Sequence, residues 1–224
     1  MTPLALAEEL LLLAYDDQTG KATGSRIGLD LGMAAAVLVE LALAGRIALD
    51  GGVIAVVDDT PTGEPIADAA LAKLAGDTPH SPASWVQRLR HGLRDRVLAD
   101  LVARGVVRDV DETPLDHIHV HRYPALDPSV EREIRARLAD ALTGRSVPDE
   151  RTAALATLLG VARMAPALHL APEEERAARL RLAEIAERAG FSGTVSLEVS
   201  TVRPSVAIVV AALAQAIQAA LGRA

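Results

Sequence analysis

The chain contains no cysteine, which excludes disulfide bonds, thiolate nucleophiles and cysteine-ligated zinc and fits a reducing, cytoplasmic compartment. Aromatic residues make up only 2% of the 224 residues, whereas alanine and leucine are frequent. Helices tolerate such a composition better than sheets, because strands favour aromatic and β-branched side chains. Since half of the residues are apolar, the chain can bury a sizeable core. The composition therefore predicts a mainly α fold.

Basic charge is also in short supply, since 23 Lys and Arg residues face 30 Asp and Glu residues, for a formal net charge of −7. Such a balance is poorly suited to broad contact with nucleic-acid phosphates, so we expect no nucleic-acid partner. Binding of an anion or a membrane surface would require a local group of basic side chains.

Long uninterrupted apolar runs are absent too. The two longest, Leu31 to Ala44 and Val206 to Leu221, contain Glu40 in the first and Gln215 and Gln218 in the second. A membrane-spanning helix needs roughly 18 to 20 almost uninterrupted apolar residues, so both segments are predicted to be buried core helices. We expect no transmembrane segment.

The leucine run near the start of the chain is interrupted by Glu8 and Glu9 and follows no basic segment, so we expect no secretory signal. From Leu4 to Tyr15 the apolar residues recur at helical spacing, while the two glutamates lie on another face. This pattern predicts an amphipathic helix.

Hairpin signals separate the helix-forming patterns along the rest of the chain. One hairpin is predicted from Arg46 to Asp58 across a Gly-Gly turn, and a second from Val106 to His121 around the turn at 111–114. Linkers are only a few residues long, so we expect a single domain over residues 1–224, with a helical core and peripheral β-hairpins. The other predicted helices are Leu31 to Leu43, Ile66 to Leu74, one or two within Ser84 to Ala103, Pro128 to Leu142, Glu150 to Met164, Pro172 to Ala189 and Pro204 to Leu221.

Basic side chains gather in one short segment of this acidic chain. If the segment is one helix, Arg90 and Arg94 are neighbours one turn apart and His91 lies beside Arg94, an arrangement suited to binding an anion. The alternative is a solvated helix face whose arginines pair with Asp95 and Asp100. The members of this group are Arg88, Arg90, His91, Arg94 and Arg96.

Histidines alternate in the predicted second hairpin. Strand geometry places His117, His119 and His121 on one face, where three imidazoles could ligate zinc or nickel. Adjacent positions on one face are about 6.5 to 7 Å apart, so a single ion would strain to reach the outer two. The other interpretation is a polar hairpin face whose charge changes at about pH 6.5. We adopt this second interpretation and predict no metal site.

Catalytic motifs are not evident at any of the standard spacings: we find no base-activated nucleophile, zinc-protease helix or glycine-rich phosphate loop. Asp77, His80 and Ser81 are close in sequence, but Pro79 and Pro82 around them indicate a turn, and triads are assembled in space. We therefore expect neither enzymatic activity nor a cofactor.

Several segments share their order and spacing with one known family. They are Ala7 to Leu13, Leu38 to Ile47, Thr60 to Gly63, Leu93 to Val97 and Leu101 to Val106. Together they extend the likeness over nearly the whole chain, which resembles the Golgi phosphoprotein 3 family. The resemblance implies a helical core with hairpins on one side and a shallow basic site where a phosphoinositide head group docks at a membrane surface.

The resemblance also implies positions for that lipid site. Eukaryotic members have a Trp after an acidic turn, an Arg early in the second helix and two further arginines, which match Ser25, Ala34, His91 and Arg94 here. Only the last keeps the family's residue, which matters because arginine binds phosphate through a fixed fork of donors. The implied head-group residues, matched or adjoining, are Arg94, His91, Arg90, Arg26 and Ser25.

Other departures shape the functional expectation. The hairpin segment 109–119 carries Asp111, Glu112 and Asp116 where eukaryotic members have an apolar tip, and the chain starts almost directly at the first helix, without their basic tail. With its Ala-, Arg- and Leu-rich composition, it is expected to be a bacterial-type member. We expect a cytoplasmic protein, peripheral at the inner face of the membrane, that binds a phosphatidylinositol 4-phosphate-like or other anionic phospholipid head group. The alternative is a protein-interaction scaffold of the same fold that has lost the lipid site and self-associates through its hairpins.

Overall fold

Helices dominate the structure, as the composition predicted. The computed structural model describes residues 4–16, 24–115, 118–168, 170–191 and 202–222. Within these ranges it contains nine α-helices, a short 3-10 helix and two small antiparallel sheets. The elements are α1 (Leu6–Ala14), α2 (Arg26–Leu43), β1 (Ile47–Asp50), β2 (Val53–Val56), α3 (Pro65–Ala75), α4 (Pro82–Leu89), α5 (Leu93–Ala103), β3 (Val110–Leu115), β4 (Ile118–Arg122), α6 (Pro128–Thr143), α7 (Glu150–Val161), η1 (Ala165–Leu168), α8 (Pro172–Arg188) and α9 (Pro204–Leu221).

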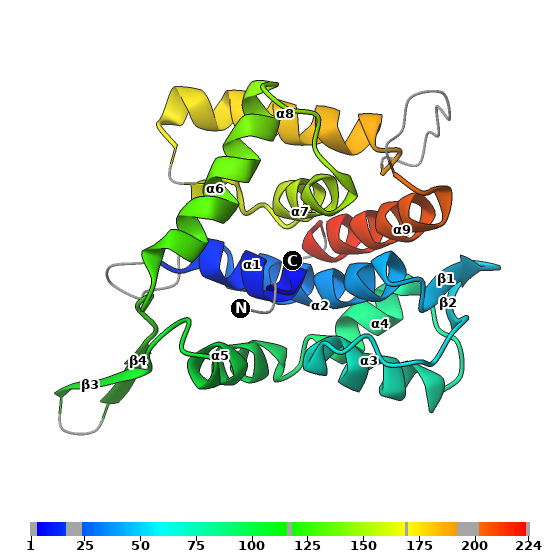
Figure 1. The fold of residues 1–224 in the computed structure, drawn as a ribbon, viewed down its shortest axis with the longest axis horizontal. Helices are drawn as coiled ribbons and strands as arrows, with labels where there is room; N and C mark the ends of the chain where they lie inside the picture. Colours follow the sequence, from blue (N-terminus) through cyan, green and yellow to red (C-terminus); the bar gives the residue numbers. More distant parts are fainter. Residues whose placement is uncertain (1–3, 17–23, 116–117, 169, 192–201, 223–224) are drawn as a thin grey trace.

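Helix α2 runs through the middle of the molecule, with α3, α4 and α5 on one side and α6 to α9 on the other (Figure 1). Its apolar residues form the centre of the core, where Leu31 and Leu38 are at most 1% exposed. Glycine allows a close approach near the start of the helix, because a Cβ added at Gly28 would lie 2.1 Å from the carbonyl oxygen of Ala162. Small side chains therefore position α2 against the end of α7.

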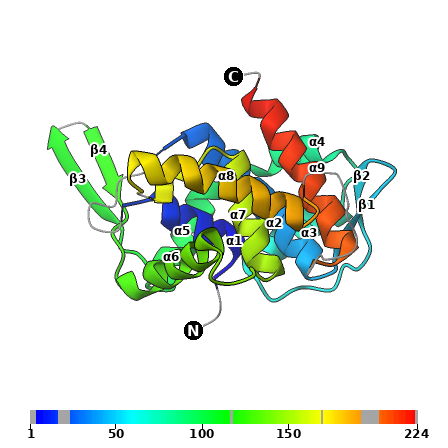
Figure 2. The same ribbon diagram turned by 90° about the horizontal axis from the view of Figure 1, so that it is seen from above.

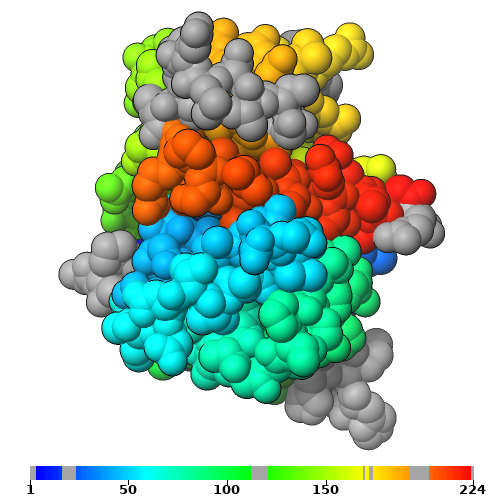
Figure 3. Space-filling model, turned by 90° about the vertical axis from the view of Figure 1, so that its right-hand side faces the viewer, coloured from blue at the N-terminus to red at the C-terminus, as the bar shows by residue number. Residues whose placement is uncertain are grey.

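Helix α9 packs on α2, α4 and α7 and forms part of the core, as predicted. It is the one described helix that is long and apolar enough to span a membrane, yet half of that window is buried inside the protein. Figure 3 shows its outer face as an orange to red band across one side of the molecule. The outer residues Gln215 and Gln218 mark the solvent side, which agrees with the reasoning from the sequence.

The two hairpins lie at opposite ends of the molecule (Figure 2). The β1–β2 hairpin has the predicted two-glycine turn, and Asp50 pairs with Val53 across the two glycines, which both have positive φ. The predicted start and turn of the second hairpin are wrong. Residues 111–114 belong to strand β3 rather than to a turn, and the chain reverses after Leu115.

The error in the second hairpin has a packing cause. Val106 and Val107 look like the start of a strand, but they follow the end of helix α5 and are packed into the core, where both are 3% exposed. The Val106 amide donates to the Leu101 carbonyl, and Val107 forms an isolated bridge with Ala125. The local pattern does not show that these two valines are buried in the core. Strand β3 therefore begins later than predicted, at Val110.

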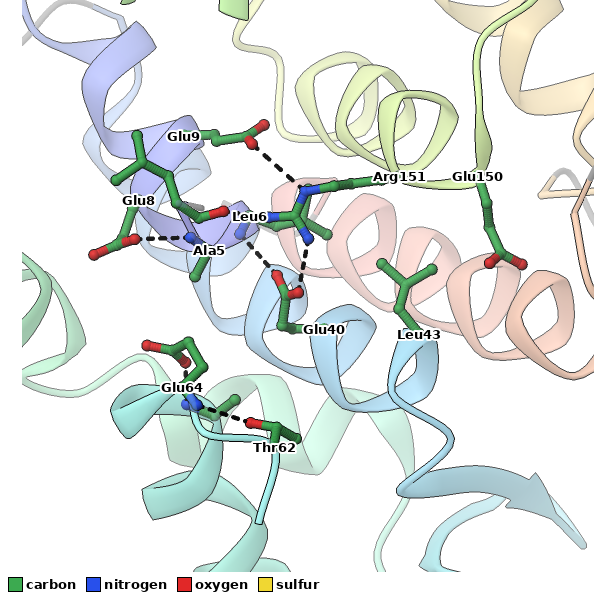
Figure 4. A network of polar contacts seen from close by, with 12 residues as sticks. Ala5, Leu6, Glu8, Glu9, Glu40, Leu43, Thr62, Glu64, Glu150 and Arg151 are labelled. Carbon is green, nitrogen blue, oxygen red and sulfur yellow. Dashed lines mark hydrogen bonds and ion pairs between the residues drawn. The ribbon is translucent and has the colours of Figure 1, made fainter. Parts of the chain in front are cut away.

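Helix α1 is not the amphipathic helix that its sequence predicted, because all of its residues are buried. Glu8 is 0% and Glu9 4% exposed. Figure 4 shows Glu9 and Glu40, from α1 and α2, meeting Arg151 of α7. Arginines from other helices neutralise both glutamates, which allows the charged side of α1 to enter the core.

Candidate functional site

The first component of the site is the start of helix α2. Ser25 is its N-cap: the Ser25 hydroxyl accepts a hydrogen bond of 3.1 Å from the amide of Gly28. This cap starts the helix at Arg26, five residues before the predicted Leu31, and leaves Arg26 exposed in the first turn. The predicted site residues Ser25 and Arg26 therefore lie at the positive end of an 18-residue helix.

The second component is the start of helix α5. Gly92, with φ of 66°, ends the turn after α4, and α5 begins at Leu93 without a side-chain cap. Arg94, in its first turn, donates a hydrogen bond of 3.3 Å from Nη2 to the Arg26 carbonyl oxygen. Arg26 and Arg94 are thereby brought together from positions 68 residues apart in the sequence.

The Arg94 guanidinium has a second partner that the sequence did not predict. Its Nη2 also donates to the Asp30 carboxylate, forming an ion pair in which the Arg94 side chain is 12% and the Asp30 side chain 27% exposed. Asp30 lies four residues after Arg26 on helix α2. This i,i+4 spacing could have indicated that the two side chains share one face of the helix. The retained arginine is therefore already paired within the protein.

The arginine group does not form one helix: of the one or two helices predicted within Ser84 to Ala103, the structure has two, α4 and α5. Helix α4 ends at Leu89, Arg90 is its C-cap, and His91 lies in the turn that Gly92 closes. His91 is exposed, and among the described residues the buried Nε of Arg90 has no hydrogen-bond partner. The i,i+4 relation that a single helix would give Arg90 and Arg94 is replaced by a turn between two helices, in which Gly92 supplies the positive φ just before the second helix.

Two other arginines of the group lie in different surroundings. Arg88 pairs with Asp77 at 2.6 Å and lies over the ring of Trp85, which is fully buried. Arg96 lies further along α5, beside a small depression that Lys73 also lines. The alternative prediction named Asp95 and Asp100 as partners of these arginines. Instead, Arg88 pairs with Asp77 and Arg94 pairs with Asp30.

The remaining family position, Ala34, is part of the core at 0% exposure. No cation can project from it. The site on this chain therefore rests on the two helix starts and the turn at Arg90 and His91, with Arg94 as its best-anchored cation.

Tyr15, at the end of α1, shows how closely charges gather here. Burial raises the pKa of its phenol, while Arg94 and Arg26 lower it and Asp30 and Asp95 raise it further. Two positive and two negative side chains thus act on one hydroxyl. No pattern in the sequence indicated Tyr15, since only the fold places the end of α1 beside the start of α5.

A chain of rings leads from Tyr15 to the second hairpin. The Tyr15 and Tyr123 rings meet edge-on with centroids 6.0 Å apart, and Tyr123 stacks on His121 at 6.4 Å. His121 Nδ1 lies 2.9 Å from a carboxylate oxygen of Asp109, and this hydrogen bond raises the pKa of His121. The hairpin base therefore adjoins the same cluster of charges.

The three-histidine interpretation is tested only in part. His117 lies outside the described residues, as does the His119 side chain. Among the residues that the structure describes, no group of three or more His, Cys, Asp or Glu side chains could hold a metal ion. His121 pairs with Asp109 instead.

These features define a helical protein with a surface cluster of arginines and carboxylates at the start of two helices. The model of the Golgi phosphoprotein 3 (GPP34) family matches residues 6–220, and the chain belongs to this family. A vacuolar protein sorting-associated protein 74 from Eremothecium gossypii is 28% identical over 169 residues, covering 64% of this chain and 50% of the relative. The protein of the same name from Schizosaccharomyces pombe is 26% identical over 169 residues, with the same two shares. The chain spans about half the length of these curated relatives.

Proposed function

We propose that this protein binds a membrane surface peripherally by recognising an anionic phospholipid head group, with a phosphatidylinositol 4-phosphate-like head group as the first candidate. The proposal is supported by membership of the Golgi phosphoprotein 3 family. On the chain itself it rests on one observation, the contact of Arg94 with the Arg26 carbonyl, which joins two of the predicted site residues. The proposed ligand contacts are Arg94, Arg26, Arg90, His91 and Ser25.

The chemistry of the two helix starts supports an anionic ligand. A helix begins with amide groups that lack internal partners, and its dipole favours negative charge there. Helix α5 has no side-chain cap. Its Leu93 amide donates to the Arg90 carbonyl, so within the described residues the amides that remain for a ligand are those of Arg94 and Asp95. An arginine next to such amides offers a phosphate both charge and directed donors.

The Asp30 carboxylate competes with the head group for Arg94. A phosphate that approaches Arg94 meets the negative charge of Asp30, and it either replaces this carboxylate or shares the guanidinium with it. We therefore propose weaker binding than in family members whose site carries several free arginines. Binding of this kind is reversible, involves no chemical turnover and weakens as salt screens the exposed charges.

The test is co-sedimentation of the full chain with vesicles. Three compositions are compared at low and moderate salt: phosphatidylcholine alone, phosphatidylcholine with phosphatidylinositol, and phosphatidylcholine with phosphatidylinositol 4-phosphate. We expect selective binding to the last composition and its loss in Arg94→Ala. Arg179→Ala is the matched control, because it removes an exposed arginine that pairs with Glu175 on helix α8.

Circular dichroism and thermal unfolding of each variant exclude a folding defect as the cause of lost binding. Equal binding of Arg94→Ala and the unchanged protein would contradict the proposed site. Absence of binding to every vesicle would contradict the function and favour the scaffold alternative, which the occupation of Arg94 by Asp30 also supports. In that case analytical ultracentrifugation would test self-association through the hairpins.

Four further predictions accompany this proposal. A single domain over residues 1–224, a cytoplasmic location at the inner face of a membrane, and the absence of a cofactor remain predictions. The bacterial origin rests on composition and on the differences from eukaryotic members alone, so it also stays a prediction.

A further inference from the structure

An arginine with an uncommon backbone conformation follows helix α7. Arg163 has a φ of 57°, and within the described part of the chain it is the one residue other than glycine with a positive φ. The Arg163 amide donates to the Gly160 carbonyl at 3.1 Å, and the Met164 amide donates to the Leu159 carbonyl at 2.9 Å. This pair of hydrogen bonds marks a helix end that usually has glycine at the position of Arg163. An arginine there costs backbone energy that a glycine would not.

The residue before Arg163 contacts the start of helix α2. A Cβ added at Gly28 would lie 2.1 Å from the carbonyl oxygen of Ala162 and 3.3 Å from its carbonyl carbon. The same point lies 3.3 Å from the Cβ of Ser25, which is the N-cap of α2 and a predicted head-group residue. The peptide bond between Ala162 and Arg163 therefore lies close to Ser25. Packing of α7 on α2 thus places Arg163 next to the head-group site.

The start of α2 lies between Arg163 and Arg94. Gly28 faces Ala162 at the end of α7, whereas Asp30 pairs with Arg94 at the start of α5. Residues two positions apart in a helix point about 200° apart, so these two contacts lie on opposite sides of α2. Figure 1 likewise shows α5 and α7 on opposite sides of α2. The two arginines therefore flank a helix that is about 10 to 12 Å across with its side chains.

The charge of Arg163 is available to a ligand. Its side chain is exposed, and among the described residues its guanidinium makes no ion pair and no hydrogen bond. Arg94, by contrast, already pairs with Asp30. No polar contact within the described residues offsets the backbone cost at Arg163, and such local strain is typical of positions that serve a function.

We propose that Arg163 is a further contact of the head-group site, which binds a head group with two phosphate groups across the start of α2. The proposal rests on the proposed function. In phosphatidylinositol 4-phosphate the two phosphates are attached to opposite carbons of the inositol ring. With the ring across the start of α2, Arg163 contacts one phosphate and Arg94 the other. A head group with one phosphate contacts only one of the two arginines, so Arg163 and Arg94 together select for the second phosphate.

Titration calorimetry with the full chain tests the proposal, using two soluble head groups, inositol 1,4-bisphosphate and inositol 1-phosphate, at low salt. We expect the unchanged protein to bind the bisphosphate about three- to tenfold more tightly than the monophosphate, the size of one additional charge-assisted contact at a surface. Arg163→Ala should remove this preference. Arg188→Ala should keep it and is the matched control, because Arg188 is an exposed arginine in the last turn of α8 without an ion pair within the described residues.

Two further variants separate binding from folding. Arg163→Gly removes the cation and also the backbone strain, so the midpoint of urea unfolding should rise while the affinity for the bisphosphate falls. Arg163→Lys keeps the charge and should retain most of the affinity. If Arg163 served the fold alone, Arg163→Gly would lower the unfolding midpoint or leave the affinity unchanged, and either result would contradict the proposal.

The vesicle assay of the proposed function distinguishes the failure of this inference from the failure of that function. Selective binding to phosphatidylinositol 4-phosphate that is lost in Arg94→Ala but kept in Arg163→Ala would overturn the role of Arg163 alone. Absence of binding to every vesicle and to both soluble head groups would overturn both proposals. Binding of inositol 1,4-bisphosphate without binding to vesicles, weakened in Arg163→Ala, would support the role of Arg163 and identify a free inositol phosphate as the ligand.

Discussion

Two groups of opposite charges in this protein use the same residue types in contrasting surroundings. At α1, Glu8 and Glu9 are 0% and 4% exposed and pair with Arg104, Arg137 and Arg151 from three other helices. At the start of α2 and α5, Arg94 pairs with a carboxylate that is 27% exposed. The carboxylates of the first group are buried, although their arginines are 26% to 36% exposed, whereas solvent reaches the carboxylate of the second pair. We therefore expect only the second pair to exchange its carboxylate for a ligand.

The buried network is structural because each of its carboxylates has several partners. Glu40 accepts from the Leu6 amide at 2.9 Å and from Arg151 at 2.7 Å, and Glu8 accepts from the Ala5 amide at 2.7 Å (Figure 4). Removal of one partner leaves a charge in a medium of low polarity, which costs far more than the loss of a surface pair. The comparison therefore predicts large stability effects at α1 and small ones at the surface site.

The largest effect is expected from Arg151→Leu. This change leaves Glu9 and Glu40 without a shared cation and removes a hydrogen bond to the Leu4 carbonyl. We expect the free energy of unfolding to fall by on the order of 3 kcal/mol in urea denaturation. Arg179→Ala, which breaks an exposed pair on α8, should change it by less than about 0.5 kcal/mol. Similar losses in both variants would contradict the distinction between the two groups.

The second effect is a pH dependence at Glu8. Burial raises the pKa of this carboxyl from 4.5 to about 7, against the opposing influence of the Ala5 amide and Arg104. The folded state holds the Glu8 proton more tightly than the unfolded chain does. The stability that protonation of Glu8 contributes is therefore full below pH 4.5 and is lost as pH rises through 7.

The measurement is the free energy of unfolding of the unchanged protein minus that of Glu8→Gln at several pH values. The difference should fall between pH 4.5 and 7 by at most about 3 kcal/mol. A difference that stays level or rises over this window would show that Glu8 is ionised throughout.

A smaller effect is expected at the surface site. Asp30→Asn removes the carboxylate that competes for Arg94 while keeping a side chain of similar shape. Affinity for vesicles with phosphatidylinositol 4-phosphate should rise about two- to fivefold at low salt, the size of one exposed ion pair. The gain should shrink at higher salt. Weaker binding by this variant would mean that Asp30 itself contacts the ligand.

The smallest effect is a titration at the hairpin. Asp109 raises the pKa of the exposed His121 in the folded protein. The stability that the His121–Asp109 pair contributes is therefore present below the usual pKa of 6.5 and is lost as pH rises through the pKa of His121 in the folded state. The His121 ring signals in NMR should report a pKa above 6.5, returning toward it in Asp109→Asn. An unchanged titration in that variant would remove Asp109 as the cause.

Much of the fold follows from local pattern. The β1–β2 hairpin, α3, α6, α8 and α9 lie within a few residues of their predicted bounds, because proline at a helix start and glycine in a turn act on their immediate neighbours. The errors occur where distant segments pack: Val106 and Val107 join the core rather than a strand, and Glu8 and Glu9 are buried rather than exposed.

The site was predicted unevenly for a related reason. Resemblance to the family pointed to Arg94 and its neighbours, and the spacing of Arg26 and Asp30 was visible in the sequence. The sequence did not show that Arg94 contacts both residues, which lie 64 and 68 positions away from it. It did not show either that Tyr15 lies nearby. Pairing between helices depends on their packing, which spacing along one helix does not show.

The sequence by itself determined the helical class, the positions of most helices and the family, since these follow from composition, periodicity and the order of local motifs. Only the tertiary structure decided which charges are buried in the core and which border the surface. The reason is physical: burial changes the free energy of a charge by several kcal/mol, and burial is set by contacts between segments far apart in the chain. Arg151 and Arg94 are the same residue type, and the surroundings of each decide its role.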